Sequence, residues 1–168
     1  MTVETEKHLY ELIRDFPVAM VVTRGAGGII HARPMAVAQL KPDAEVYFAT
    51  SLDTPKVAEI EADPRVAITF QSPAGYAALN GTAVVVRDKA LIDQLWSEAW
   101  RVWFPLGKDD PTLCLLRVTA HSGEYWDRGG TNRLKYLFEG LKAVLQGTTP
   151  DVDDDPSQHA KVQMGARR

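Results

Sequence analysis

The 168-residue sequence predicts a mainly β protein with helices, in which six antiparallel strands form a barrel. Six segments have the short apolar or alternating pattern of strands, and short turns join most of them. Such a sheet usually curls into a barrel, because closure removes its unpaired edges. We expect helices to cover the open ends.

The first part of the chain reads as a helix, three strands and a short helix. The expected elements are a helix that ends at Pro17, strands at Val18–Thr23, Ile29–Val37 and Glu45–Ser51, and a helix of about two turns that starts near Pro55. The run Val18–Thr23 is continuously apolar, as in a strand buried on both faces. Glycines follow it, so the first two strands form a hairpin.

The second part adds three strands and two helices. The expected elements are strands at Arg65–Gln71, Tyr76–Arg87 and Leu113–Ala120, the last continuing irregularly to Trp126, and helices at Asp88–Phe104 and Leu134–Leu145. Asn80-Gly81 usually marks a hairpin, but we interpret it as a glycine bulge because its flanks are too short to pair. Trp96, Trp100 and Trp103 then share one helical face, which favours core or interface packing over a cofactor site.

Composition narrows the function classes. The net charge of −3 argues against a nucleic-acid-binding protein, which needs a basic face. The single cysteine, Cys114, excludes an internal disulfide and falls in an apolar strand, where we expect it to be buried. The four histidines lack metal-ligand spacing, so no metal site is predicted.

Location and domain limits follow from the same survey. No apolar run approaches the ~18 residues of a membrane span, and the N-terminus lacks a signal-peptide pattern. We therefore expect a soluble cytoplasmic protein that does not bind membranes. Residues 1–147 form one domain, and residues 148–168 form a polar tail that we expect to be flexible, with His159–Met164 as the part able to dock.

Arg33 breaks the pattern of its strand. Alternation in Ile29–Val37 places it in a mostly apolar stripe with Met35. A guanidinium there needs an anion, because a buried unpaired charge is very costly. The sequence leaves two partners open, a bound anionic ligand or an Asp or Glu of the same chain. Pro34 lacks an N–H, so this strand lies at an edge or carries a bulge.

Lys56 is the second anomaly, at the start of the short helix. Thr54 is a favourable N-cap, and Pro55 suits the first helical position. Lys56 opposes the positive end of the helix dipole, which a bound anion would reverse. A solvated surface lysine is the alternative to a phosphate site. The hydroxyls that could join Lys56 around a phosphate belong to Thr50, Ser51 and Thr54.

Two further residues could contact a ring. Gln71 ends the neighbouring strand and can offer donors and acceptors to a polar ring edge. Trp126 lies in an irregular segment, where stacking on a ring and plain core packing are both open. Because Arg33 and Lys56 both seek anions on adjacent elements, we expect one ligand with a phosphate at one end.

These segments, in this order, resemble the FMN-binding split-barrel proteins of the pyridoxamine 5′-phosphate oxidase-like family, and most of all the general stress protein 26 branch. The resemblance runs from about Leu9 to Leu145. The segments that carry it are His31–Ala36, Val46–Ser51 with Lys56, Arg65–Gln71, Tyr76–Ala83 and Gly123–Asp127.

The resemblance implies FMN at the interface of a homodimer, oxidoreductase chemistry and a role in stress response. The sequence identifies no catalytic acid or base. By position the resemblance places Lys56 on the phosphate with help from Arg33, and Gln71 near the ring. Trp126 completes the pocket, from the same or the other subunit. The residues along the flavin are Arg33, Pro34, Met35, Ala36 and Val37, with Thr50 and Ser51 lining the same site.

One departure from the family pattern argues against pyridoxamine phosphate oxidase activity. True pyridoxamine phosphate oxidases have a C-terminal arginine-rich segment for the substrate phosphate, and the segment Asp127–Arg133 does not match it. The alternatives that stay open are a flavin carrier or redox sensor that acts through a partner, a pyridoxamine 5′-phosphate oxidase-type oxidase, and FAD, a deazaflavin or haem in place of FMN. The redox substrate stays unknown.

Overall fold

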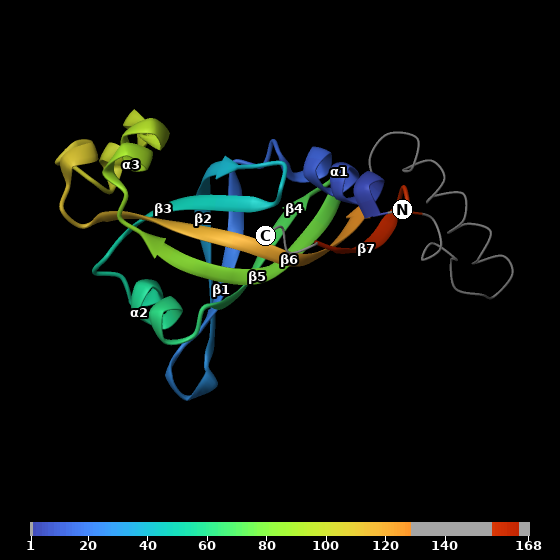
Figure 1. The fold of residues 1–168 in the computed structure, drawn as a ribbon, viewed down its shortest axis with the longest axis horizontal. Coiled ribbons are helices and arrows are strands. Elements are labelled where there is room, and N and C mark those ends of the chain that lie inside the picture. Colours follow the sequence, from blue (N-terminus) through green and yellow to red (C-terminus); the bar gives the residue numbers. More distant parts are fainter. Residues whose placement is uncertain (1, 129–155, 165–168) are drawn as a thin grey trace, which may run out of the picture.

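The computed structural model describes residues 2–128 and 156–164, and its strands form one antiparallel sheet (Figure 1). The strand order is β3-β2-β1-β4-β5-β6-β7, and an additional pairing of β3 with β6 closes the first six strands into a barrel. This confirms the predicted six-stranded antiparallel barrel. The strands are β1 (Val18–Arg24), β2 (Ile30–Leu40), β3 (Glu45–Ser51), β4 (Arg65–Ser72), β5 (Gly75–Val86), β6 (Leu113–Asp127) and β7 (His159–Gln163).

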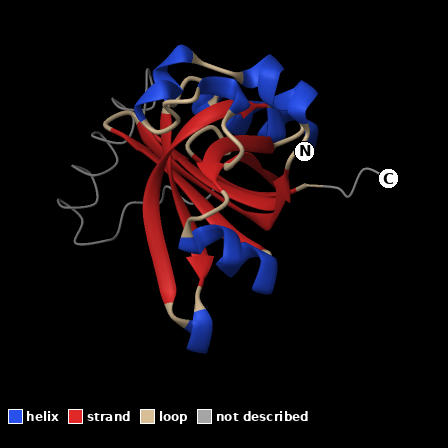
Figure 2. Ribbon diagram, turned by 90° about the vertical axis from the view of Figure 1, so that its left-hand side faces the viewer, coloured by secondary structure: helices blue, strands red, loops and turns tan. Residues whose placement is uncertain are grey.

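Helices lie on opposite sides of the barrel (Figure 2). Leu9 and Ile13 on α1 pack into the barrel core, and so do Val57 and Ile60 on α2. Within the described ranges, no helix has the length and apolar character needed to cross a membrane. The helices are α1 (Thr2–Ile13), α2 (Pro55–Ala62) and α3 (Lys89–Leu95), with short 3-10 helices η1 (Ala26–Gly28), η2 (Glu98–Val102) and η3 (Gly107–Asp109).

The barrel splits between β2 and β3. β3 pairs with β6 along its whole length, but it pairs with β2 only over Val37–Leu40, where the register shifts at Ala38. The preceding stretch Ile30–Ala36 pairs with β1 and has a free edge on the β3 side. Pro34 lies in this stretch, which confirms its predicted edge position. The split leaves room for a cavity between the two strands.

Strand β5 passes through Asn80-Gly81 without a turn, which confirms the predicted single strand, although the extra residue of the bulge lies on β6 and not on β5. Its register with β6 shifts between these two residues. A Cβ on Gly81 would lie 2.0 Å from the backbone oxygen of Thr119, so the two backbones approach too closely for any side chain. The extra residue of this bulge is His121 of β6, because Asn80 pairs with Ser122 and Gly81 with Ala120, whereas β5 pairs with β4 without a shift.

Strand β1 buries one face only within a single chain. Ala19, Val21 and Thr23 point into the barrel and are 1–2% exposed. On the other face, Val18 is 46% exposed. The sequence predicts that both faces of this strand are buried, but among the described residues only the inner face is covered.

The predicted helix from Asp88 to Phe104 is wrong as a single element. Asp88 caps α3 as expected, since its side chain accepts hydrogen bonds from two backbone N–H groups of the first turn. However, α3 ends at Leu95, and the chain continues as η2 from Glu98. Residues 96–112, which connect α3 to β6, are called the aromatic insert below.

Local capping ends the helix early. The Ser97 side chain accepts a hydrogen bond from the N–H of Ala99, which starts a new turn instead of continuing α3. The three tryptophans therefore do not share one helical face, which corrects the second part of that prediction. Trp100 is buried at 7% exposure, whereas Trp103 is 66% exposed.

Strand β7 comes from the segment that was expected to be a polar tail. It pairs with the end of β6, and Val162 reaches the barrel core at 1% exposure. This segment includes the part, His159–Met164, that the sequence analysis considered able to dock. The predicted helix Leu134–Leu145 and most of the remaining tail lie outside the described residues.

Candidate functional site

A cavity of about 370 Å³ lies at the split of the barrel. Its lining comes from the free stretch of β2, the end of β3, the start of α2 and the aromatic insert. A larger cavity of about 580 Å³ lies beside α1 and contains none of the predicted site residues. We therefore place the candidate site at the split.

The fold brings together eight of the eleven predicted site residues in this cavity. Four belong to β2, and four belong to β3 and the first part of α2. The common cause is the split, because the two strands separate where these residues occur. The eight are Arg33, Pro34, Met35, Ala36, Thr50, Ser51, Thr54 and Lys56.

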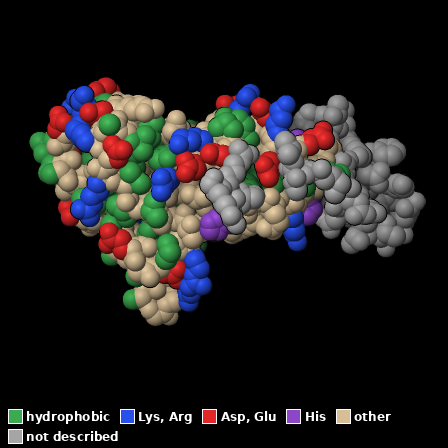
Figure 3. Space-filling model, in the orientation of Figure 1, with side chains coloured by type: hydrophobic (Ala, Val, Ile, Leu, Met, Phe, Trp, Pro, Cys, Tyr) green, Lys and Arg blue, Asp and Glu red, His purple; other side chains and the backbone are tan. Residues whose placement is uncertain are grey.

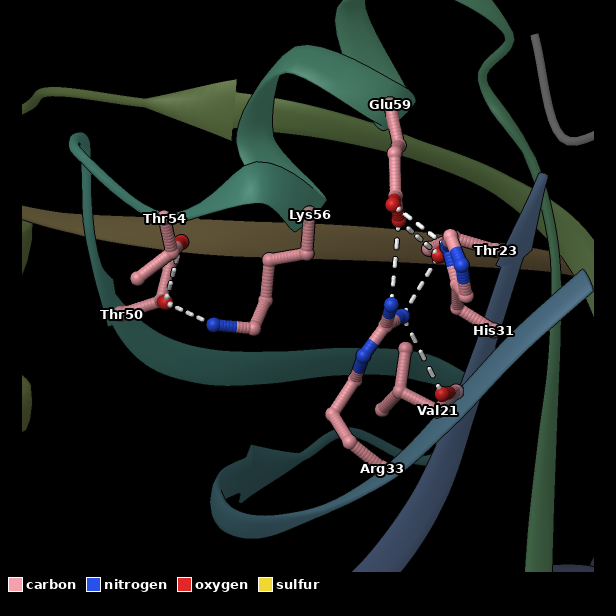
Figure 4. A network of polar contacts seen from close by, with 8 residues as sticks. All are labelled: Val21, Thr23, His31, Arg33, Thr50, Thr54, Lys56 and Glu59. Carbon is pink, nitrogen blue, oxygen red and sulfur yellow. Dashed lines mark hydrogen bonds and ion pairs between the residues drawn. The ribbon is translucent and has the colours of Figure 1, made fainter. Parts of the chain in front are cut away.

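Lys56 is a half-buried cation at the polar end of the cavity (Figure 4). Its Nζ donates a hydrogen bond to Thr50 Oγ1 at 3.1 Å. Among the described residues, no ion pair joins it to a carboxylate. Burial, and then the nearby charge of Arg33, lowers the pKa of Lys56. An anion at this position would stabilise the charged form.

Thr54 occupies the predicted N-cap position but does not make the expected capping bond. Its hydroxyl donates instead to the backbone oxygen of Ser51 at 2.8 Å and lies 3.4 Å from Thr50 Oγ1. The hydroxyls of Thr50 and Thr54 thus stand side by side, with Lys56 reaching toward them (Figure 4). Hydroxyls and an ammonium group in this arrangement suit a phosphate.

Arg33 has an internal partner, which decides the alternative left open by the sequence. Its Nη2 donates to Glu59 Oε2 at 3.0 Å, and its Nη1 donates to Thr23 Oγ1 at 2.5 Å. Thr23 donates in turn to the same Glu59 oxygen at 2.5 Å, and His31 Nδ1 lies 2.7 Å from the other oxygen. Glu59 therefore neutralises Arg33 inside the wall of the cavity (Figure 4).

Glu59 belongs to the site but is not among the residues predicted from the sequence. The signal was its spacing, because Glu59 follows Lys56 by three residues on α2 and therefore projects from the same side of the helix. The side chain of Glu59 is only 11% exposed. A buried carboxylate of this kind requires donors, and the β1–β2 hairpin supplies three.

Replacing Glu59 with glutamine is expected to lower the free energy of unfolding by about 2 kcal/mol at pH 7, because charged hydrogen bonds are lost. The hydrogen bond from Thr23, followed by those from His31 and Arg33, lowers the pKa of Glu59 against the opposing effect of burial. The carboxylate therefore stabilises the fold fully above its ordinary pKa of 4.5, and this contribution disappears as the pH falls through the lower folded value.

Urea unfolding of Glu59→Gln and the wild-type protein over a pH series measures this effect. Glu61→Gln, an exposed change on the same helix, is the matched control and is expected to leave stability nearly unchanged. A stability difference for Glu59→Gln that stays constant from neutral to acid pH would contradict the role of the carboxylate.

Three predicted site residues lie outside the cavity. Val37 packs against the barrel core, and its N–H donates to the Pro17 oxygen. Gln71 and Trp126 flank Tyr76 in adjacent strands, on the outer face of the sheet. Trp126 is 37% exposed, and its ring stacks on His159 at a centroid distance of 5.2 Å. Within one chain, these two residues do not meet the cavity.

The aromatic insert supplies cavity residues that were not predicted as site residues. Trp100, Trp103 and Phe104 line the side of the cavity formed by the insert. The sequence predicts core or interface packing for the tryptophans, and this is confirmed for Trp100, which belongs to a core cluster. Cys114 is fully buried as predicted, and burial raises its pKa to about 11.

Comparisons with known proteins give a consistent family match. A family model described as pyridoxamine 5′-phosphate oxidase like matches residues 4–151. The chain is 35% identical over 78 residues to general stress protein 26 of Bacillus subtilis (strain 168), over 44% of this chain and 55% of that protein. The chain thus spans about half the length of this relative.

Solved structures extend the match to nearly the whole chain. A protein described as a general stress protein 26 from Jannaschia sp. CCS1 superposes with a TM-score of 0.71 and 28% identity, covering 97% of this chain and 99% of that chain. A general stress FMN/FAD binding protein from Xanthomonas citri has a TM-score of 0.62 and 28% identity, covering 77% of this chain and 90% of that chain.

Proposed function

Because the chain belongs to the pyridoxamine 5′-phosphate oxidase-like family, we propose that it binds FMN in the cavity at the barrel split and acts as an oxidoreductase. The observation that carries this proposal is Lys56, a half-buried cation that faces hydroxyls and lacks a carboxylate partner among the described residues. FMN ends in a phosphate, which supplies the missing anion. The FMN/FAD binding of the Xanthomonas citri relative supports a flavin as the ligand.

The residues of the chain bind and orient the cofactor. Lys56, Thr50 and Thr54 hold the phosphate, and Ser51 lies beside them. The free stretch of β2 from Arg33 to Ala36 lines the cavity and is the part that would lie along the ribityl chain and the ring. When bound, the flavin supplies hydride or electron transfer. FAD is the alternative cofactor, and a role in stress response follows the names of the relatives.

Arg33 positions β2 beside the proposed cofactor and adds little to the attraction for its phosphate. Its guanidinium is already neutralised by Glu59, so Lys56 carries the electrostatic attraction for the phosphate. The network from Glu59 to Thr23 fixes Arg33 in the cavity wall. It thereby fixes the conformation of β2 beside the ligand.

We propose further that the protein is a homodimer with flavin at the interface. Val18, Met20 and Val22 project from the outer face of β1. The same face continues through Ala67 and Thr69 on β4 to Ala78 and Asn80 on β5, so it is mostly apolar with two polar residues. In an antiparallel sheet with one face in water, the residues on that face are usually polar. The mostly apolar outer face of β1, β4 and β5 therefore favours contact with a protein partner. Gln71 and Trp126 lie on the same outer face and can reach the cavity of a second subunit.

Replacing Ala78 with arginine in the middle of this face is expected to convert the dimer to a monomer of 18.6 kDa and to weaken FMN binding. The reason is that a charge would be buried without a partner at the interface. Light scattering after size-exclusion chromatography measures the mass. Asp43→Arg, an exposed change in the β2–β3 turn, is the control that keeps the dimer mass. A wild-type protein of monomer mass would refute the dimer.

The absorption spectrum of the freshly purified protein is the direct test of the cofactor. We expect flavin bands, and release of FMN on denaturation as identified by mass. Oxidation of NADH or NADPH in the presence of electron acceptors then tests oxidoreductase activity. A colourless protein that also fails to take up added FMN would refute the proposed function.

A further inference from the structure

The candidate cavity has two chemically different sides. The polar part of its lining is Lys56 and its hydroxyl neighbours, whereas the aromatic insert contributes Trp100, Trp103 and Phe104. Trp100 and Phe104 are 7% and 4% exposed and belong to a core cluster with β3 and β6 residues. Trp103 lines the cavity but is 66% exposed. One large aromatic ring at the cavity is therefore largely uncovered within a single chain.

The backbone holds Trp103 in this position. The N–H groups of Trp103 and Phe104 both donate to the Trp100 oxygen at 2.9 Å. Because Trp100 and Phe104 are anchored in the core, the residue between them is presented from a fixed turn. Val102 and Leu106 beside it are 79% and 70% exposed, and Figure 3 shows hydrophobic surface at this end of the molecule.

The charges around the cavity exclude a second anion. Arg33 is neutralised by Glu59, and the flavin phosphate neutralises Lys56 in the proposed site. The insert adds two cations, and both pair with nearby carboxylates: Arg101 bonds to Glu98, and Lys108 lies 4.0 Å from an Asp93 oxygen. Both cations of the insert are thus paired, so the insert itself offers no free positive charge beside Trp103 to balance another negative charge.

We propose that the aromatic side of this cavity binds a second ligand, an uncharged planar ring of the quinone class, and that Trp103 determines this specificity. The inference rests on the proposed flavin site, because the phosphate there neutralises Lys56. An apolar ring gains by covering the exposed indole, and aromatic pairs add stability beyond the buried area. An anionic substituent would lose its hydration without gaining a partner.

Calorimetric titration with two naphthoquinones tests the proposal. The probes are menadione, which is uncharged, and 1,4-naphthoquinone-2-sulfonate, which has the same ring system with a negative charge. Each is titrated into FMN-loaded and FMN-free protein, and FMN affinity is measured separately. Quinone addition to a thiolate does not compete, because the single cysteine, Cys114, is fully buried and its pKa is raised to about 11.

We expect menadione to bind FMN-loaded protein at least about 10-fold more tightly than the sulfonate. Trp103→Ala is expected to weaken menadione about 10-fold, and Trp103→Phe to stay within about threefold of wild type, because phenylalanine keeps an aromatic face. Val102→Ala is the matched control: this neighbour is more exposed, does not line the cavity and is expected to change nothing.

Three results would overturn the inference: equal or tighter binding of the sulfonate, unchanged menadione binding by Trp103→Ala, or a loss of FMN affinity in that variant as large as the loss for menadione. The last result would assign Trp103 to the flavin itself. A wild-type protein that binds no FMN would instead refute the proposed function. Menadione binding that depends on Trp103 in the flavin-free protein would still support the aromatic subsite.

Discussion

Replacing Lys56 with alanine is expected to weaken FMN binding by about 10- to 100-fold, as the loss of a charge-assisted hydrogen bond predicts. Riboflavin binding is expected to stay within about threefold of wild type, because riboflavin has the same ring and ribityl chain but no phosphate. The reason lies in the local charges: Arg33 is committed to Glu59, so Lys56 is the cation that can meet the phosphate. Fluorescence quenching of each flavin measures the two affinities.

The comparison of the two ligands separates a phosphate contact from general damage to the site. Lys7→Ala, at an exposed position on α1, removes the same charge far from the cavity and is expected to leave both affinities unchanged. Equal losses for FMN and riboflavin in Lys56→Ala would remove the phosphate role of this lysine. The salt dependence of FMN binding is also expected to fall in Lys56→Ala, because an ion pair is lost.

Replacing Gly81 with alanine is expected to destabilise the protein by at least about 3 kcal/mol, near the upper range for single substitutions. The added Cβ would lie 2.0 Å from the Thr119 oxygen, so β5 and β6 would have to separate at the bulge. All three nearest atoms belong to the backbone of Thr119 and Ala120, so a rotamer change cannot relieve the strain. Urea unfolding followed by circular dichroism measures the loss.

A second glycine separates this steric effect from a conformational one. Gly27 has a φ of +68° but nothing lies within 4 Å of its added Cβ. Gly27→Ala is therefore expected to cost only the left-handed backbone conformation, about 1–2 kcal/mol. A loss for Gly81→Ala no larger than that for Gly27→Ala would contradict the close approach of β5 and β6.

The strands could be predicted because their signal is local. Alternating and continuous apolar runs identified the six barrel strands, and the short flanks of Asn80-Gly81 correctly favoured one continuous strand over a turn. The helix at Asp88–Phe104 failed for the opposite reason. Its composition favours a helix, but the Ser97 cap and the burial of Trp100 and Phe104 against the barrel favour a broken segment.

The site was predictable to the extent that its residues break local patterns. Arg33 in an apolar stripe and Lys56 in the first turn of a helix are anomalies in the sequence itself, and the structure brings both to one cavity. Trp103 was not recognised as a cavity residue, because an aromatic side chain in a predicted helix looks like core packing. Its exposure depends on where the insert leaves the helix.

The sequence by itself determined the strands, including the continuity of β5 through Asn80-Gly81, and the two cationic positions, because periodicity and single-residue chemistry are local properties. Only the tertiary structure decided how the charges pair. Glu59 is 26 residues from Arg33, and it becomes its partner because α2 packs against β1, the strand that pairs with β2 at Arg33. Lys56, on the same side of that helix, reaches the hydroxyls of Thr50 and Thr54 instead. That choice depends on distances between elements far apart in the chain, which no local pattern encodes.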